Sequence, residues 1–134
     1  MATEFGGLHF WVRDMEASLA FYRLVGLPIA DDAQGEFVNI TLPGGRDFAF
    51  GTYGLTRQYD AGFAAPSSGG KSAVALQFNV ESRAAVDEMF ERLTGAGYAG
   101  HLAPFDAFWR ARYCEVMDPD GNVVGFHSPQ DRVL

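Results

Sequence analysis

Two short stretches of the chain, 8–14 and 76–82, share the same alternation of apolar and polar positions. The first reads LHFWVRD and the second reads LQFNVES, with leucine, phenylalanine and valine at matching places. Alternation with a period of two is typical of a strand that buries one face and exposes the other. The pattern therefore predicts two equivalent strands and indicates that the chain contains an internal repeat.

A helix signal follows each of these strands. Asp14 and Ser82 are suited to the N-cap, because their side-chain oxygens can accept a hydrogen bond from a free backbone N–H. Apolar residues then recur at helical spacing: Met15, Leu19 and Tyr22 in the first segment, and Val86, Met89, Phe90 and Leu93 in the second. Gly26 is predicted to end the first helix, and Gly95 or Gly97 the second.

Three short strands are predicted after each helix. They cover about 28–32, 36–42 and 47–53 in the first half, and about 98–102, 109–117 and 122–127 in the second. The last two of these are joined by DPDGN, which is typical of a tight turn. The predicted fold class is therefore α+β, with two βαβββ modules.

The module boundaries follow from the same pattern. Module one covers about 5–53 and module two about 72–129, within a single domain of residues 1–134. The segment 54–71 lacks periodicity and ends in serine, glycine and proline, so it is predicted to be the linker.

Composition narrows the possible partners and location. The net charge is −7, the isoelectric point is near 4.7, and no basic stripe is present, which argues against binding to nucleic acid. No apolar run is long enough to span a bilayer, and no signal segment opens the chain. A single cysteine, Cys114, cannot form an internal disulfide, which fits the cytoplasm. We expect a cytoplasmic protein that binds neither nucleic acid nor membrane.

Few side chains suggest covalent or ionic chemistry. Cys114 lies in an alternating strand pattern without a paired base, so it is not predicted to be a nucleophile. Asp31, Asp32 and Glu36 form an acidic cluster in a loop, which is predicted to be mainly a solvated surface, with contact to a cationic ligand as the alternative.

Two longer motifs resemble a known family. VRDMEASLAFYRLVGL, followed much later by DPDGNVVGF, is similar to the vicinal oxygen chelate superfamily, and the likeness covers about 5–129. This superfamily includes glyoxalase I, bleomycin-resistance proteins, fosfomycin-resistance enzymes and extradiol dioxygenases. The resemblance implies that the two modules form an open cup-shaped sheet with the helices outside, and that the protein assembles as a homodimer.

The resemblance also implies where a metal would be held. Metal-using members take ligands from the first and last strands of each module, and here those positions are Gly7, Ala75, Ala49 and Gly125. None of these residues offers the imidazole nitrogen or carboxylate oxygen that a divalent metal needs. We therefore expect no metal and no cofactor, in the pattern of metal-free bleomycin-resistance-like members. The four small residues also predict a wide floor to the cup.

Polar side chains lie one pleat away from these positions. Residues two places apart on a strand share a face, so His9, Gly51, Gln77 and His127 are predicted to point into the cup. His9, Gln77 and His127 either line a polar cavity or form a displaced metal site.

Aromatic residues make up 14% of the chain, more than a small core requires. Flat rings clamp planar or cationic molecules by stacking and cation–π contact. The predicted ligand-binding residues are His9, Trp11, Phe50, Gln77, Phe105, Trp109, Phe126 and His127, around the floor residues Gly7, Ala49, Ala75 and Gly125.

Two classes of function remain open from the sequence. The first is a metal-free protein that sequesters a bulky aromatic or cationic small molecule such as a natural-product antibiotic, as bleomycin-resistance proteins do. The alternative is an enzyme: a glyoxalase-like metal-dependent lyase, isomerase or dioxygenase that uses His9, Gln77 and His127, or a cofactor-free catalyst with His9 or His127 as acid or base.

Overall fold

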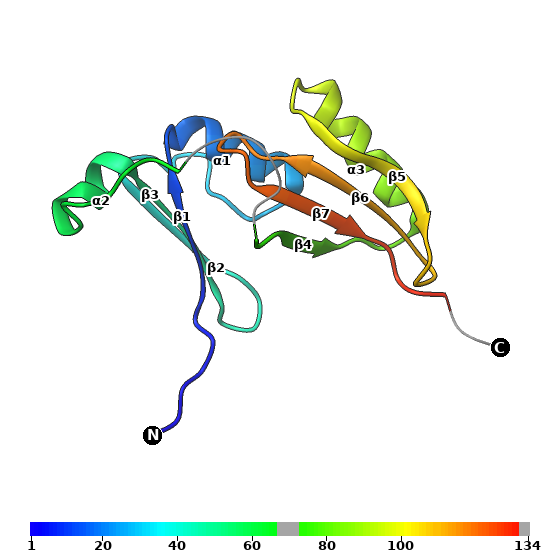
Figure 1. Cartoon of the computed structure of the whole chain (residues 1–134), viewed down its shortest axis with the longest axis horizontal. Coiled ribbons are helices and arrows are strands. Elements are labelled where there is room, and N and C mark those ends of the chain that lie inside the picture. The colour runs from blue at the N-terminus through cyan, green and yellow to red at the C-terminus, as the bar shows by residue number, and fades with distance from the viewer. Residues whose placement is uncertain (67–72, 132–134) are drawn as a thin grey trace. The chain divides into compact units, whose positions relative to one another are not determined.

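The computed structural model describes residues 1–66 and 73–131. The chain divides into two compact units, one on each side of the boundary between residues 67 and 68. The first unit contains β1 (Gly7–Val12), α1 (Met15–Val25), β2 (Phe37–Thr41), β3 (Asp47–Thr52) and α2 (Tyr53–Tyr59). The second contains β4 (Leu76–Asn79), α3 (Arg83–Gly95), β5 (Gly100–Ala107), β6 (Ala111–Met117) and β7 (Val123–His127) (Figure 1). Each unit combines helix with an open sheet, which confirms the predicted α+β class.

The sheet of the first unit has the order β1-β3-β2. β1 runs parallel to β3, and β2 runs antiparallel to it. Asp14 caps α1 by accepting a hydrogen bond from the Ala17 N–H, and Gly26 ends the helix at a positive φ of 112°, as predicted. The helix packs on the sheet through aromatic rings: the Tyr22 centroid lies 5.7 Å from that of Phe10 and 5.5 Å from that of Phe50.

The sheet of the second unit has the order β4-β7-β6-β5. β4 and β7 are parallel, and the other neighbours are antiparallel. Ser82 caps α3, and the helix ends at Gly95, as predicted. The core beneath α3 is fully buried and contains Val86, Leu93, Cys114, Val116 and Phe126.

The predicted strand at 28–32 is wrong, because this segment is a loop with a turn at Asp31–Asp32. Its backbone bonds locally: the Leu27 N–H donates to Tyr22, and the Ala33 N–H donates to Ala30. Pro28 has no N–H to offer a neighbouring strand. The first unit therefore has one strand fewer than the predicted βαβββ module.

The predicted linker at 54–71 is also wrong in its first part, which forms α2. Thr52 caps this helix by accepting a hydrogen bond from the Leu55 N–H. Tyr53 and Thr56 are buried at the helical spacing of three, and the Thr56 hydroxyl donates to the Thr52 carbonyl. Such a short amphipathic pattern is hard to distinguish from a loop by sequence. Residues 67–71 of the predicted linker lie outside the described residues.

The β5–β6 hairpin differs from the predicted strands at 98–102 and 109–117. β5 extends to Ala107 and includes Phe105, while Phe108, Trp109 and Arg110 form the turn. Arg110 adopts a positive φ of 67°, and its N–H donates to the Ala107 carbonyl. This turn places Trp109 at the end of the sheet.

Gly7 has a structural role that the sequence did not reveal. It has a φ of 146°, and a Cβ built on it would lie 2.0 Å from the Asp47 carbonyl oxygen on β3. The predicted role of Gly7, as a small residue that opens the floor of a cup, is wrong, because its missing side chain would point into backbone.

We predict that Gly7→Ala lowers the free energy of unfolding by about 1–3 kcal/mol, because the new methyl group forces β1 away from β3 and the φ is unfavourable. Gly6→Ala is the matched control, since a Cβ there meets nothing within 4 Å. Urea denaturation of both variants measures the difference. Equal stability of the two variants would contradict this role.

Candidate functional site

The sheet of the second unit has one face under α3 and one face that carries polar and aromatic side chains. The strand register places Gln77, Gly125 and Glu115 in one row across β4, β7 and β6, and Leu102 of β5 is paired with Glu115. The next row contains His127, Tyr113 and Phe105. Because residues in register share a face, these two rows form a continuous surface.

A hollow of about 370 Å³ lies on this surface. It is lined by Gln77, Leu102, Phe105, Trp109, Tyr113, Glu115 and His127, and we call it the sheet hollow. Four of the predicted ligand-binding residues meet there: Gln77, Phe105, Trp109 and His127. Leu102, Tyr113 and Glu115 were missed by sequence reasoning, although Tyr113 and Glu115 have the same parity in RYCEVM.

Aromatic rings form one wall of the sheet hollow. The ring centroid of Phe105 lies 6.3 Å from that of Trp109 and 6.1 Å from that of Tyr113, both edge to face. Trp109 and Tyr113 also meet edge to face, with centroids 5.9 Å apart. Each ring therefore holds its neighbours in place, which reduces the conformational entropy that a stacking ligand would have to overcome.

Tyr113 occupies the space beside Gly125. A Cβ on Gly125 would lie 2.4 Å from the Tyr113 hydroxyl oxygen and within 3 Å of two ring carbons. The predicted wide floor at Gly125 is therefore wrong, because the phenol of the neighbouring strand fills the volume. The absence of a side chain at Gly125 lets this ring lie flat on the sheet.

Glu115 places a carboxylate next to Gly125, on the paired strand. The side chain is buried, with 3% of the residue exposed, and Oε2 accepts a hydrogen bond of 2.7 Å from the Tyr113 hydroxyl. Oε1 lies 3.8 Å from His101 Nε2. Burial raises the pKa of the Tyr113 phenol, and the hydrogen bond to Glu115 raises it further. Tyr113 is thus a neutral hydrogen-bond donor to the carboxylate.

His127 is held by Trp109. The Trp109 indole N–H donates a 2.7 Å hydrogen bond to His127 Nε2, and the two rings lie at 10° to one another. Indole N–H is only a donor, so Nε2 must be unprotonated and Nδ1 carries the proton of the neutral ring. A metal ion at either nitrogen would displace the indole or the Nδ1 proton.

The first unit presents a similar face with a different composition. His9, Ala49 and Asn39 form one row across β1, β3 and β2, and Trp11, Gly51 and Phe37 form the next. The His9 ring lies over Gly51, because a Cβ there would be 3.0 Å from His9 Nε2. Trp11 and Phe37 are about half exposed, at 46% and 52%. Phe37 was not among the ligand-binding residues predicted from the sequence. Its place on this face follows from its pairing with Gly51, which only the structure shows.

The predicted places of Phe50 and Phe126 are wrong. Both side chains are fully buried under the helices, where Phe50 contacts Phe10 and Tyr22, and Phe126 stacks on Phe78. Side chains alternate between the two faces of a strand. Phe50 follows Ala49 and Phe126 follows Gly125, which lie on the polar and aromatic face, so both phenylalanines point to the face under the helix. Ala75 precedes β4 and is exposed, so it lies outside the sheet hollow.

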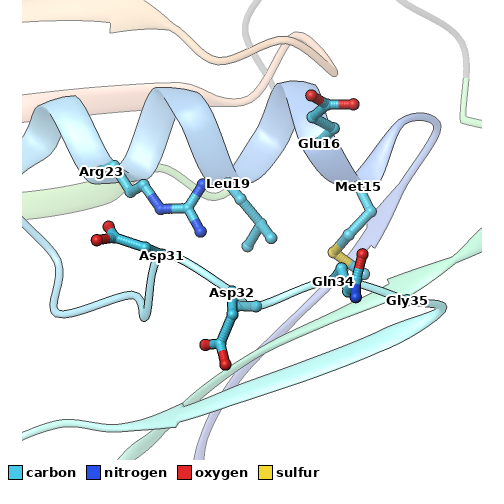
Figure 2. Close-up of a pocket in the computed structure, with 9 residues that line it drawn as sticks. Met15, Glu16, Leu19, Arg23, Asp31, Asp32, Gln34 and Gly35 are labelled. Carbon is cyan, nitrogen blue, oxygen red and sulfur yellow. The ribbon is translucent and has the colours of Figure 1, made fainter.

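A larger hollow of about 450 Å³ lies between α1 and the loop at 31–35, and we call it the loop hollow. Figure 2 shows Arg23 and Leu19 extending from α1 toward the segment that carries Asp31 and Asp32. Charges of both signs line it, and Arg23 donates to the Ala30 carbonyl. The sheet hollow is the better candidate despite its smaller volume, since it combines rigid strands, three aromatic rings and a buried carboxylate.

Two kinds of reactive group are missing among the described side chains: a cluster of three acidic, histidine or cysteine metal ligands, and an activated thiol. Within residues 1–66 and 73–131, no three His, Cys, Asp or Glu side chains come together as a metal-binding group. The four positions to which the sequence resemblance assigns metal ligands are glycine or alanine, which have no donor atom. Burial raises the pKa of the Cys114 thiol to about 12, so it is not a thiolate at neutral pH.

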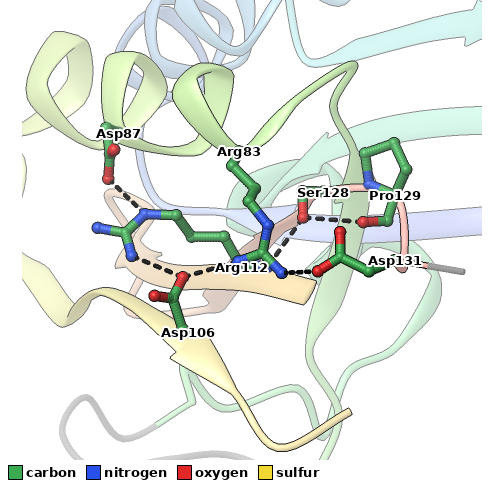
Figure 3. Close-up of polar contacts among 7 residues, drawn as sticks. All are labelled: Arg83, Asp87, Asp106, Arg112, Ser128, Pro129 and Asp131. Carbon is green, nitrogen blue, oxygen red and sulfur yellow. Dashed lines mark hydrogen bonds and ion pairs between the residues drawn. The ribbon is translucent and has the colours of Figure 1, made fainter. Parts of the chain in front are cut away.

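A network of ion pairs supports the end of the sheet that carries Trp109. Arg83 of α3 donates to Asp106 of β5 at 2.7 Å and to Asp131 at 2.6 Å (Figure 3). Arg112 of β6 donates to Asp87 at 2.9 Å and to the same Asp106 at 3.0 Å. The hydrogen bond to Asp131 raises the pKa of the Arg83 guanidinium.

The C-terminal segment links this network to the Trp109 turn. The Asp131 N–H donates to the Arg110 carbonyl at 2.8 Å, and the Gln130 side-chain amide donates to the Trp109 carbonyl at 3.1 Å. Arg83 thus binds Asp131 of the C-terminal segment, and Gln130 of the same segment binds the backbone of Trp109.

Comparison with known proteins identifies the family. Residues 5–126 match the Glyoxalase/Bleomycin resistance protein/Dioxygenase superfamily, and the chain belongs to this superfamily. No curated protein matches it in sequence.

No helix among the described residues is long and apolar enough to cross a membrane.

Solved structures agree with this assignment. A glyoxalase-related enzyme from Fulvimarina pelagi has a TM-score of 0.77 at 23% identity, over 96% of this chain and 89% of that chain. A glyoxalase/bleomycin resistance protein/dioxygenase from Nocardioides has a TM-score of 0.74 at 22% identity, over 99% and 87%. Lactoylglutathione lyase from Agrobacterium tumefaciens has a TM-score of 0.66 at 20% identity, over 95% and 94%. At these identities the likeness establishes the fold alone.

We predict that Gly125→Ala lowers stability through Tyr113. The new methyl group displaces the phenol and breaks its hydrogen bond to Glu115, at a cost of about 1–3 kcal/mol in the free energy of unfolding. In a Tyr113→Ala background the same change has little cost, since the obstructing ring is gone. A double-mutant cycle in urea measures the coupling, and additive effects would contradict the packing of Tyr113 on Gly125.

We also predict that Arg83→Gln loosens the C-terminal segment. Loss of the ion pair to Asp131 should increase hydrogen exchange at the Asp131 amide severalfold, because that amide is protected by its bond to Arg110. Arg46→Gln is the control: it makes the same charge change in the first unit, where Arg46 donates to the nearby Gly44 carbonyl. Unchanged protection in Arg83→Gln would mean that the network does not hold this segment.

Proposed function

We propose that this protein binds and sequesters a planar aromatic small molecule, such as a natural-product antibiotic, without using a metal. The observation that carries the proposal is the sheet hollow, where three mutually braced aromatic rings face a space of about 370 Å³. Stacked aromatic pairs contribute about 0.5–1.5 kcal/mol beyond the burial of their surface. The exposed rings of Trp11 and Phe37 provide further aromatic surface on the first unit.

The side chains around the sheet hollow favour binding over catalysis. His127 has its Nε2 engaged by Trp109, and Tyr113 is a poor acid because burial raises its pKa. A general acid or base works best with a pKa near the working pH and with a free atom directed at the substrate. Neither His127 nor Tyr113 meets both conditions.

The alternative is a lyase, isomerase or dioxygenase with a metal held by His9, Gln77 and His127. Gln77 and His127 do line the same hollow, which supports it in part. The hydrogen bond from Trp109 to His127 Nε2 weighs against it, because metal binding would sacrifice that bond. Two imidazoles and an amide also make a weak ligand set without a carboxylate.

A thermal-shift screen of planar aromatic natural products tests the proposal. A ligand that binds only the folded state raises the melting temperature, and at a fixed concentration a tighter ligand raises it more. We predict that Trp109→Ala weakens binding of any such ligand about tenfold, or about 1.4 kcal/mol, because the wall of the hollow loses its central ring.

Phe5→Ala is the matched control, since Phe5 is an exposed aromatic residue that precedes β1. It should leave affinity unchanged. Equal affinity in Trp109→Ala and wild type, with both proteins folded, would show that the ligand does not use the sheet hollow.

A further inference from the structure

We infer that the ligand of the sheet hollow is an aromatic cation, with a planar ring system that bears a protonated or quaternary nitrogen, and that Glu115 recognises its charge. This inference rests on the proposed function and adds the chemical class of the ligand. It depends on three features of the described residues: the position of Glu115, the rings around it, and the residue types that line the sheet hollow.

Glu115 is the acidic residue of the sheet hollow. It lies in the row that also contains Gln77 and Gly125, and it lines the sheet hollow together with the three rings. A charge in a buried position interacts strongly with another charge a few ångströms away, because the effective dielectric constant is far below that of water. A cation that enters the hollow would therefore be stabilised much more by Glu115 than by an exposed carboxylate.

The aromatic wall favours the same charge. Phe105, Trp109 and Tyr113 present rings to the hollow, and the negative face of an aromatic ring attracts a cation within about 6 Å. The same rings stack on a planar molecule. A ligand that is both planar and cationic satisfies the wall and the carboxylate at once, whereas an anion would be repelled by both.

None of the residues that line the sheet hollow is lysine or arginine. Arg112, three residues earlier on β6, donates to Asp87 of α3 and to Asp106, and Asp87 lies on the helix that covers the opposite sheet face. His101 approaches Glu115 only to 3.8 Å and carries a charge only when protonated.

Two probes of equal shape and different charge test the inference. 1-Methylquinolinium is a planar cation, and 1-methylnaphthalene is its neutral counterpart. Binding is followed by NMR at the Trp109 indole N–H, whose resonance is identified by its loss in Trp109→Phe. In the wild-type protein we expect the cation to bind at least tenfold more tightly than the neutral probe. The anion 1-naphthoate should bind more weakly than either.

Glu115→Gln separates the local carboxylate from the general acidity of the chain. Glutamine keeps the size of the side chain and an oxygen that can accept the Tyr113 hydrogen bond. We expect this variant to bind the two probes within about threefold of each other, with the affinity for 1-methylnaphthalene unchanged. Glu88→Gln is the control: it removes one charge from the exposed face of α3 and should keep the full preference.

The outcomes distinguish the inference from the proposed function. Equal affinity of wild type for the cation and the neutral probe overturns the inference and leaves an aromatic-binding hollow. A preference that survives Glu115→Gln, or that falls equally in Glu88→Gln, overturns the role of Glu115. If no probe shifts the Trp109 resonance, both the inference and the proposed function fail. Should Glu115→Gln not fold, the order of the three probes in the wild-type protein still decides the sign of the preferred charge.

Discussion

Each sheet of this protein has one face covered by a helix, and this single constraint decides which side chains are available for binding. Tyr22 of α1 packs on Phe10 and Phe50, and Val86 of α3 lies over a core that includes Cys114 and Phe126. Successive residues of a strand point to opposite faces. Because these residues are buried under a helix, the residues next to them in the strand point to the uncovered face of the sheet. The polar and aromatic surface of each sheet is therefore a consequence of how its core is filled.

In the sheet hollow, two side chains of β6 surround a glycine of β7. Gly125 offers no side chain at a position to which the sequence resemblance assigns a metal ligand. Tyr113 lies in the vacated space, and its hydroxyl donates to Glu115, which is paired with Gly125 across the sheet. Glu115 thus places a carboxylate on the strand next to Gly125, but this carboxylate is buried and accepts a hydrogen bond from the Tyr113 hydroxyl.

The rigidity of the aromatic wall depends on elements far from it in sequence. Trp109 lies in a turn with a left-handed residue at Arg110, and its indole is fixed by His127. Its backbone is fixed by Gln130, next to the residue that Arg83 holds by an ion pair. Exposed ion pairs contribute little stability on their own. Here the ion pair between Arg83 and Asp131 lies in a segment whose backbone donates to the Arg110 carbonyl, next to Trp109.

The sequence by itself determined the features that depend on local periodicity and capping. The helices after Asp14 and Ser82, the matching strands at 8–14 and 76–82, and the superfamily all followed from short patterns that act within a few residues. The loop at 28–32, helix α2, and the burial of Phe50 and Phe126 needed the tertiary structure, because a strand exists only where a partner strand accepts its hydrogen bonds, and a side chain's face depends on that pairing. The DPDGN turn sets the register that pairs Glu115 with Gly125. Only the tertiary structure decided that the Tyr113 ring fills the space over Gly125 and that Glu115 is buried, because both depend on how the side chains pack.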